Sequence, residues 1–325
     1  MIEGIVIKST GSWYNVRRID TNEVVQCRIK GKFRLKEKIL TNPVAVGDVV
    51  SFELEEDNTI KDAMPHVSAN GIINKIHDRK NYVARQSPRR IHDIHLLASN
   101  VDQTVLFSTI IEPTVKVGFI DRFLLMTEPH DIPTVIVFNK KDIYDKVAMA
   151  EYDYLKNIYV PIGYKTLLVS AITGEGLDEL RDLLKDKTSL LAGQSGVGKS
   201  SIVNAIQPQL DLRIGDISDY SGKGQHTTTF AEMHPLSFGG YLIDTPGIKN
   251  LSFNNLEPMD VAHNFREFFQ LSKQCRFGGS CSHINEPGCA VLDALQKETI
   301  SSSRYQNYLK ILDEIGDINY WERNE

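Results

Sequence analysis

The strongest chemical signal in the sequence is a glycine-rich segment, Gly193-Gln194-Ser195-Gly196-Val197-Gly198-Lys199-Ser200-Ser201. An apolar run at residues 189–192 precedes it and a helical pattern follows, which is the strand, loop and helix context of a P-loop. Backbone N–H groups of such a loop cradle phosphate oxygens, Lys199 can neutralise them, and the Ser200 hydroxyl can bind Mg²⁺. An ordinary glycine turn is the alternative. The context favours a nucleotide-phosphate site.

An acidic turn, Asp244-Thr245-Pro246-Gly247, follows the apolar run at residues 241–243. Beside a P-loop, a carboxylate at a strand end such as Asp244 can hold Mg²⁺ directly or through water. The N–H of Gly247 can reach a γ-phosphate because no Cβ obstructs it. Alone, the tetrapeptide indicates only a turn. Together with the P-loop, it predicts the acidic part of a magnesium and nucleotide site.

The tetrapeptide Asn139-Lys140-Lys141-Asp142 ends the apolar run at residues 134–138 and bears on the choice of base. The Asp142 carboxylate can accept both donors of guanine, the imino N–H and the exocyclic amine, whereas adenine presents an acceptor at the imino position. Unpaired polar groups in a buried site are costly, so adenine would be rejected. Lys140 can lay its stem over the base, and Asn139 can tie this loop to the P-loop. A surface turn is the alternative.

The order of these motifs is itself informative. Ser170-Ala171, after the run at residues 166–169, is similar to a second base-binding element whose backbone N–H meets the guanine keto oxygen. In Ras-like GTPases both base-binding elements follow the P-loop, and here both precede it. A circularly permuted domain can fold because the termini of a domain often lie close together. The order therefore predicts a circularly permuted GTPase domain.

The segment 223–229, between the P-loop and Asp244, is the predicted first switch. Either Thr228 or Thr229 is expected to bind Mg²⁺ and face the γ-phosphate. Ile248 stands where Ras-like enzymes carry a glutamine that orients water, so unassisted hydrolysis is expected to be slow. His226 is the resident candidate for positioning the water, and a solvated loop histidine is the equally weighted alternative.

Three of the four cysteines gather near the C-terminus, where Cys275, Cys281, His283 and Cys289 form the pattern C-x5-C-x-H-x5-C. Three thiolates and an imidazole complete a tetrahedral Zn²⁺ site, and they leave no position for a catalytic water. The site is therefore expected to be structural, with one Zn²⁺. Free cysteines with an incidental histidine are the alternative, and Cys27 stands alone.

These motifs require elements that position them. From residue 101 onward, apolar strand runs alternate with helical patterns, with strands expected at residues 104–108, 134–138, 166–169, 189–192 and 241–243. This alternation predicts a doubly wound α/β sheet, in which ligands bind beyond the carboxyl ends of the strands. The nucleotide motifs all fall at those ends.

The first 70 residues instead predict short strands at residues 4–8, 13–18, 24–29 and 49–54. Such spacing favours a small barrel of the OB type, a fold that commonly binds RNA. Trp13, Tyr14 and Phe33 could stack on bases, although a core position is the better interpretation for each of them singly. Six cations occupy alternate positions and would line one face of a strand, as a phosphate-contacting ridge or a solvated surface: Arg28, Lys30, Lys32, Arg34, Lys36 and Lys38.

The predicted organisation has four parts: an OB-type barrel (1–72), a basic linker (73–98), the permuted GTPase domain (99–250) and a mostly helical zinc-binding domain (251–325). Length, 41% hydrophobic residues and 24% charged residues are typical of soluble multi-domain proteins. A net charge of −5 argues against a polyelectrolyte partner for the whole surface. We find no apolar run long enough for a membrane span, and we expect a cytoplasmic monomer without a membrane partner.

The permuted motif order, the segment Gly224-Gln225-His226-Thr227-Thr228-Thr229 and the cysteine pattern together resemble the ribosome small-subunit-dependent GTPase A (RsgA) family over essentially the whole chain. In this resemblance Gln225 replaces a frequent arginine, and the first cysteine interval is one residue longer than in the familiar pattern. The resemblance implies GTP hydrolysis with Mg²⁺, a structural Zn²⁺, and action in late maturation of the small ribosomal subunit. It also implies that the subunit stimulates hydrolysis, with the subunit and its rRNA as partners.

Two other functions remain open from the sequence. One is an RNA-binding assembly module in which the nucleotide is only structural. The other is a permuted GTPase of large-subunit assembly, against which the barrel and the cysteine cluster argue.

Overall fold

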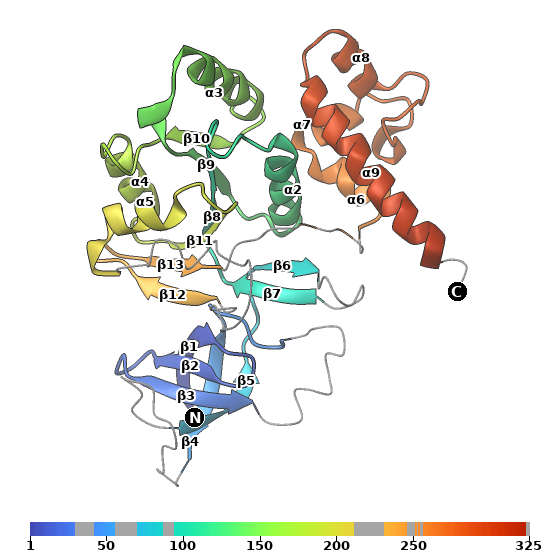
Figure 1. Ribbon diagram of the computed structural model, residues 1–325. Helices are drawn as coiled ribbons and strands as arrows, with labels where there is room; N and C mark the ends of the chain where they lie inside the picture. Colours follow the sequence, from blue (N-terminus) through green and yellow to red (C-terminus); the bar gives the residue numbers. More distant parts are fainter. Residues whose placement is uncertain are drawn as a thin grey trace.

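The computed structural model describes residues 1–29, 42–55, 70–86, 94–210, 231–245, 251, 253 and 256–322. Figure 1 shows three units: a small barrel at the bottom, a central sheet covered by helices, and a helical C-terminal unit beside it. Gly247, His226, Thr228 and Thr229 lie outside the described residues. Five of the six alternating cations do so as well: Lys30, Lys32, Arg34, Lys36 and Lys38.

The described part of the N-terminal unit is a closed barrel of five strands. They are β1 (Ile2–Ser9), β2 (Tyr14–Arg18), β3 (Val24–Ile29), β4 (Val49–Leu54) and β5 (Asn70–Ile76). The strands follow one another as β1-β2-β3-β5-β4, and pairing of β4 with β1 closes the barrel. Val6, Val16 and Phe52 are among its fully buried residues. The predicted barrel is confirmed, and β5, which the sequence pattern missed, completes it.

The central unit is a sheet with the order β10-β9-β8-β11-β13-β12. Its members are β8 (Gln103–Ser108), β9 (Thr134–Phe138), β10 (Lys165–Leu168), β11 (Thr188–Gly193), β12 (Glu232–Pro235) and β13 (Tyr241–Asp244). All neighbours are parallel except β12, which runs antiparallel to β13. Every residue of β8 is buried, as expected for a strand covered on both faces.

Helices cover both faces of this sheet, so the predicted doubly wound fold is confirmed. On one face, α2 (Val117–Thr127) and α3 (Lys146–Tyr159) share a core with Ile136 and Phe138. On the other, α4 (Leu177–Leu184) and α5 (Lys199–Ile206) share a core with Val105 and Val137. Three short 3-10 turns also occur: η1 (Glu128–His130), η2 (Lys141–Ile143) and η3 (Pro208–Leu210).

The barrel and the central sheet are continuous. Lys8 on β1 pairs with Glu232 on β12, and their side chains form an ion pair at 2.7 Å. This single junction joins eleven described strands into one sheet. The antiparallel edge strand β12 is therefore the backbone connection between the two units.

The segment expected to be a basic linker is largely structured in its described part. It holds an antiparallel pair, β6 (Tyr82–Gln86) and β7 (Ile94–Ser99), in which Val83 and Ala98 are fully buried. Figure 1 shows this pair between the barrel and the rest of the central unit. The prediction of a linker was wrong because it rested on the charged residues of this segment and overlooked the buried apolar residues between them.

A buried carboxylate fixes the barrel to this segment. Asp48 is fully buried, and its carboxylate accepts hydrogen bonds from Nε of Arg79 at 2.7 Å and from the Ser99 hydroxyl at 2.6 Å. The preceding residue, Gly47, has a φ of +95°, and a Cβ there would lie 2.1 Å from the carbonyl oxygen of Ser99. Only glycine permits this close backbone approach.

The C-terminal unit is helical. It contains α6 (Pro258–Asn264), α7 (Arg266–Ser272), the 3-10 turn η4 (Gly278–Ser280), α8 (Ala290–Gln296) and α9 (Ser302–Glu322). A Pro at the first helical position and a reciprocal capping box with Glu257 and Asp260 start α6. Among the described residues, no helix combines the length and apolarity that crossing a membrane requires.

One buried arginine joins the C-terminal unit to the central sheet. Arg304 on α9 is 2% exposed and donates to Glu267 on α7 at 2.7 and 2.9 Å and to Asp121 on α2 at 2.7 Å. Asp121 also accepts from Tyr159 at 2.7 Å and from Asn307 at 2.6 Å. Burial opposes the charge of Arg304, but the two carboxylates raise its pKa well above the usual value.

We expect Arg304→Ala to destabilise the fold by about 3–5 kcal/mol, because it leaves two buried carboxylates without their cation. Thermal unfolding followed by circular dichroism measures the loss. Arg122→Ala is the matched control: Arg122 also joins α2 to α9, through Glu314 at 2.5 Å, but this pair is partly exposed. It should cost no more than about 1 kcal/mol. Equal thermal unfolding midpoints for the two variants would contradict the role of Arg304.

Candidate nucleotide site and zinc centre

The carboxyl ends of four parallel strands bring the nucleotide motifs to one edge of the sheet. Gly193 pairs with Phe107, and Asp244 pairs with Leu191, so β8, β11 and β13 end side by side. The P-loop follows β11, and its Gly198 precedes the first turn of α5 with a φ of +82°. The loop therefore has the strand, turn and helix geometry that can present backbone N–H groups to phosphates.

One side chain ties three of the predicted motifs together. Asn139, 2% exposed, donates from Nδ2 to the carbonyl of Val197 in the P-loop at 2.9 Å. Its Oδ1 accepts from the backbone N–H of Ala171 at 3.2 Å. A Cβ at Gly198 would lie 2.3 Å from Nδ2 of Asn139, so the P-loop needs glycine at this point. The predicted link between Asn139 and the P-loop is present.

Asp142 lies against the Ser-Ala element. The Ser170 hydroxyl donates to Oδ1 of Asp142 at 2.5 Å and accepts from the backbone N–H groups of Ile172 and Thr173 at 3.2 and 3.1 Å. Asp142 itself is exposed. The Ser170 hydroxyl therefore orients the Asp142 carboxylate, which remains accessible to a ligand from the solvent side.

The two lysines of this loop have different partners. Lys140 has a φ of +68° and its ammonium donates to the carbonyl oxygen of Glu112. Lys141 forms an ion pair with Glu175, beside the Ser-Ala element. Lys140 therefore reaches across the site toward the loop that follows β8, whereas Lys141 closes the neighbouring turn.

The phosphate end of the site holds a buried cation and a carboxylate. Nζ of Lys199, 5% exposed, lies 3.5 Å from Oδ1 of Asp244. That oxygen is buried and has no hydrogen-bond partner among the described residues. Buried polar atoms normally have a partner, and Mg²⁺ prefers oxygen ligands. The carboxylate of Asp244 therefore fits the role of a magnesium ligand beside Lys199, and Ser200, the next residue, stays a predicted ligand.

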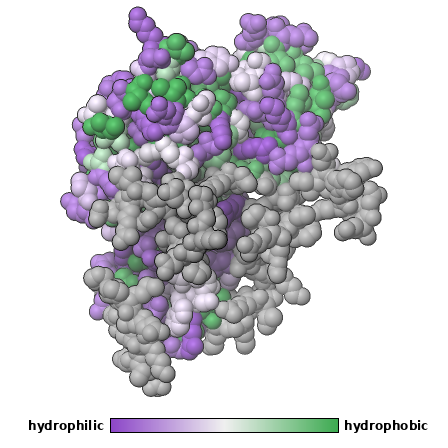
Figure 2. Space-filling model, viewed as in Figure 1, coloured by the Kyte–Doolittle hydropathy of each residue, from purple (hydrophilic) through white to green (hydrophobic). Residues whose placement is uncertain are grey.

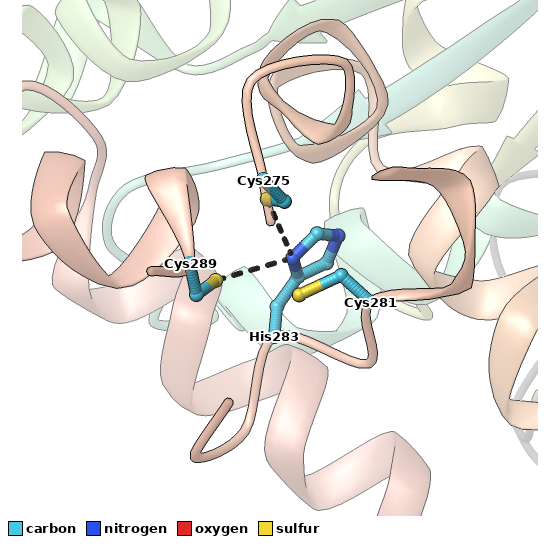
Figure 3. A group of neighbouring side chains, drawn as sticks. All are labelled: Cys275, Cys281, His283 and Cys289. Carbon is cyan, nitrogen blue, oxygen red and sulfur yellow. Dashed lines mark hydrogen bonds between the residues drawn. The ribbon is translucent and has the colours of Figure 1, made fainter. Parts of the chain in front are cut away.

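The four predicted zinc ligands meet in the C-terminal unit. Figure 3 shows Cys275, Cys281, His283 and Cys289 pointing toward one another. Their ligand atoms all lie within 4.8 Å of one another, and Nδ1 of His283 is 3.8 and 3.4 Å from Sγ of Cys275 and Cys289. Ordinary zinc bond lengths in a tetrahedron place sulfur and nitrogen about 3.6 Å apart. The cluster fits a structural zinc ion.

The surroundings of the cluster suit a metal. Burial raises the pKa of Cys281 to about 12, so a cation is needed to keep that thiol deprotonated. Burial lowers the pKa of His283 and favours the neutral imidazole that binds metals. The N–H of Ala290, at the start of α8, points to Sγ of Cys275 at 3.3 Å. Tyr305 on α9 donates to the carbonyl of His283 at 2.9 Å, so the cluster also holds α9 in place.

A model of the RsgA GTPase matches residues 76–254, and a model of the RsgA N-terminal domain matches residues 3–59. The chain belongs to the RsgA GTPase family.

Its relatives include the "Small ribosomal subunit biogenesis GTPase RsgA" of Flavobacterium psychrophilum, 48% identical, with 95% of this chain and 92% of the relative covered. A relative of the same name from Phocaeicola vulgatus is 45% identical, with 96% and 97% covered. The crystal structure of YjeQ from Thermotoga maritima is 35% identical and superposes with a TM-score of 0.74, covering 97% of this chain and 98% of that one. YloQ, described as a circularly permuted GTPase, is 31% identical with a TM-score of 0.69, covering 98% and 96%.

Family membership confirms the circularly permuted GTPase domain that the motif order predicted. From the sequence, a core position was the better interpretation for each barrel aromatic: Tyr14 is fully buried and bonded to Asn42, whereas Trp13 is 37% exposed and Phe33 lies outside the described residues. Arg28, the described member of the alternating cations, is exposed and paired with Glu55.

Sequence reasoning missed the loop after β8 and Tyr144. The Tyr144 hydroxyl donates to the carbonyl of Asn139 and accepts from the N–H of Ile110, both at 2.7 Å. A tyrosine after Asn-Lys-x-Asp carries no chemical signal of its own, so only the fold shows its contacts.

Cys275→Ser should remove the metal, because a tetrahedral site that loses one thiolate binds zinc far more weakly. Elemental analysis of the purified protein should find about one zinc per chain in the parent and well under half of that in the variant. Cys27→Ser, which alters the buried barrel cysteine, is the control and should keep the zinc. A full zinc complement in Cys275→Ser would contradict the assigned centre.

Proposed function

We propose that this protein is a GTPase that binds the small ribosomal subunit and hydrolyses GTP to GDP and phosphate in late subunit maturation. The tie from Asn139 to both Val197 and Ala171 carries the proposal, since it holds the base-binding loops and the phosphate loop in one site. The names of the relatives from Flavobacterium psychrophilum and Phocaeicola vulgatus supply the ribosomal role.

The nucleotide would be held from both ends. Asp142 would accept the two donors of guanine while a backbone N–H of the Ser-Ala element meets its keto oxygen, and Lys140 would cover the base plane. At the other end, residues 193–201 would wrap the phosphates with their N–H groups, and Lys199 would neutralise the developing charge. Ser200 and Asp244 would hold Mg²⁺, with Thr228 or Thr229 as a further ligand, and the ion would neutralise charge on the phosphates.

Hydrolysis is proposed to be slow without the subunit. Ile248 cannot hydrogen-bond the attacking water, so that water must be oriented by another group. His226 is the proposed group, with the N–H of Gly247 near the γ-phosphate. The RNA surface would then complete the active site only when the subunit is bound.

The flanking units offer RNA contacts. The alternating cations from Arg28 to Lys38 would meet phosphates of the rRNA in the proposed complex. In the C-terminal unit, Phe269 and Phe277 are each about half exposed, and Arg276 lies 5.7 Å from the ring centre of Phe277. Figure 2 shows hydrophobic residues at the surface of this unit among hydrophilic ones. Aromatic rings beside cations are typical of RNA contacts.

We propose that the protein acts as a cytoplasmic monomer.

Asp142→Asn should lower the affinity for GDP by orders of magnitude and shift the preference toward xanthosine diphosphate, because the new amide donates where guanine also donates. Isothermal titration with both nucleotides measures the change. Asp145→Asn is the matched control: Asp145 caps α3 through the N–H of Ala148 at 2.8 Å, and asparagine caps equally well. Retained guanine selectivity in Asp142→Asn would remove the assigned role of Asp142.

Purified small subunits should raise the rate of phosphate release by this protein, and large subunits should not. Lys199→Ala should abolish GTP binding, whereas His226→Ala should keep the affinity for GTP but lose the stimulated rate by about 10²–10⁴-fold. Phosphate release and co-sedimentation, measured across salt concentrations, report both effects. Co-sedimentation without any stimulated release by the parent protein would instead favour an RNA-binding module with a structural nucleotide.

A further inference from the structure

The loop that joins β8 to α2, residues 109–116, lies at the centre of the nucleotide edge of the sheet. It is closed on itself: the Thr109 hydroxyl donates to the carbonyl of Pro113 at 2.7 Å, and the N–H of Val115 donates to the carbonyl of Ile110 at 3.0 Å. We name it the β8–α2 loop. Because its backbone is internally bonded, it can act as a fixed support for its neighbours.

This loop meets the Asn-Lys-x-Asp segment at two points. At one, the Tyr144 hydroxyl stands between the N–H of Ile110 and the carbonyl of Asn139, 2.7 Å from each. At the other, the Lys140 ammonium donates to the carbonyl of Glu112. The two contacts lie on either side of Asp142 in the sequence, so they fix the segment that carries the carboxylate at both ends.

The same loop also borders the P-loop. A Cβ built on Gly196 would lie 3.6 Å from Cδ of Pro113, which is ordinary contact distance. The β8–α2 loop is therefore wedged between the base-binding segment and the phosphate-binding segment. The Tyr144 hydroxyl forms hydrogen bonds with both the β8–α2 loop and the backbone of Asn139.

The local backbone explains how Tyr144 reaches this position. The 3-10 turn η2 begins after Lys140, and Tyr144 ends it with its N–H bonded to the carbonyl of Lys141 at 3.0 Å. Tyr144 follows this turn, and from there its hydroxyl reaches the N–H of Ile110 in the loop. Burial raises the pKa of its hydroxyl to about 12, so the group stays protonated and can donate at neutral pH.

We propose that Tyr144 is a positioning residue for guanine discrimination, which acts through Asn139 and the β8–α2 loop to set the orientation of Asp142. This inference rests on the proposed function of the site. Tyr144 does not need to touch the nucleotide, since its hydroxyl bonds only the protein backbone in the contacts above. Its effect should therefore fall on the choice of base and not on the chemical step.

The test is Tyr144→Phe, which keeps the ring and removes the hydroxyl. Affinities for GDP and inosine diphosphate are measured by isothermal titration. Inosine diphosphate lacks the exocyclic amine, so it can make only one of the two contacts with Asp142. A displaced carboxylate costs GDP more than inosine diphosphate, and the preference for GDP should fall about two- to tenfold, the size of one lost hydrogen bond. The maximal rate of GTP hydrolysis at saturating GTP should stay unchanged.

General destabilisation would have a different signature, because it lowers the folded fraction and weakens both nucleotides by one factor. Tyr164→Phe is the matched control: it removes a tyrosine hydroxyl that bonds Glu128 at 3.0 Å, outside the nucleotide loops, and should keep the parent preference. A parent-like preference in Tyr144→Phe would overturn this inference alone. If the parent protein bound no GDP, or did not prefer it over inosine diphosphate, the proposed function itself would fail.

Discussion

The side-chain amide of Asn139 is the contact on which the nucleotide edge of this protein depends. It is buried, it donates to the P-loop and accepts from the Ser-Ala element, and a glycine at position 198 makes room for it. An amide is suited to this place because it offers a donor and an acceptor in fixed geometry without a charge to desolvate. In the permuted chain, the P-loop is no longer the first element of the domain, so this side chain joins segments that the chain order separates.

Three ion pairs with buried carboxylates hold the flanking units in place. Asp48 with Arg79 fixes the barrel to the segment that holds β6 and β7, and Arg304 with Asp121 and Glu267 fixes the helical unit to the central one. Each group is satisfied by several hydrogen bonds, as buried charges require. Such directional contacts define one orientation more sharply than apolar packing does, so the surfaces that flank the nucleotide edge are presented in a set arrangement.

Motifs and buried strands could be predicted from the sequence because both depend on local patterns. The P-loop, the base-binding tetrapeptide and the strand at residues 134–138 carry their signal within a few residues. β12 could not be predicted: Glu232 and His234 are polar, and the strand exists because it pairs with β13 and with β1, which is remote in sequence. In the basic segment, the apolar residues such as Val83 showed a packed element, but the partner of Arg79 could not be predicted because it is Asp48 in another unit. The contacts of Tyr144 could not be predicted either, because they form only where the β8–α2 loop meets the segment of Asn139.

The junction of β1 with β12 gives the sheet a mechanical property. Because Lys8 and Glu232 are strand neighbours and also form an ion pair, the barrel is attached directly to the edge strand of the central sheet. β12 is followed by β13, which ends at Asp244, and it starts shortly after Thr228 and Thr229 in the sequence. Any change in the direction of this edge strand would therefore also change the orientation of the barrel, since β1 is paired to it.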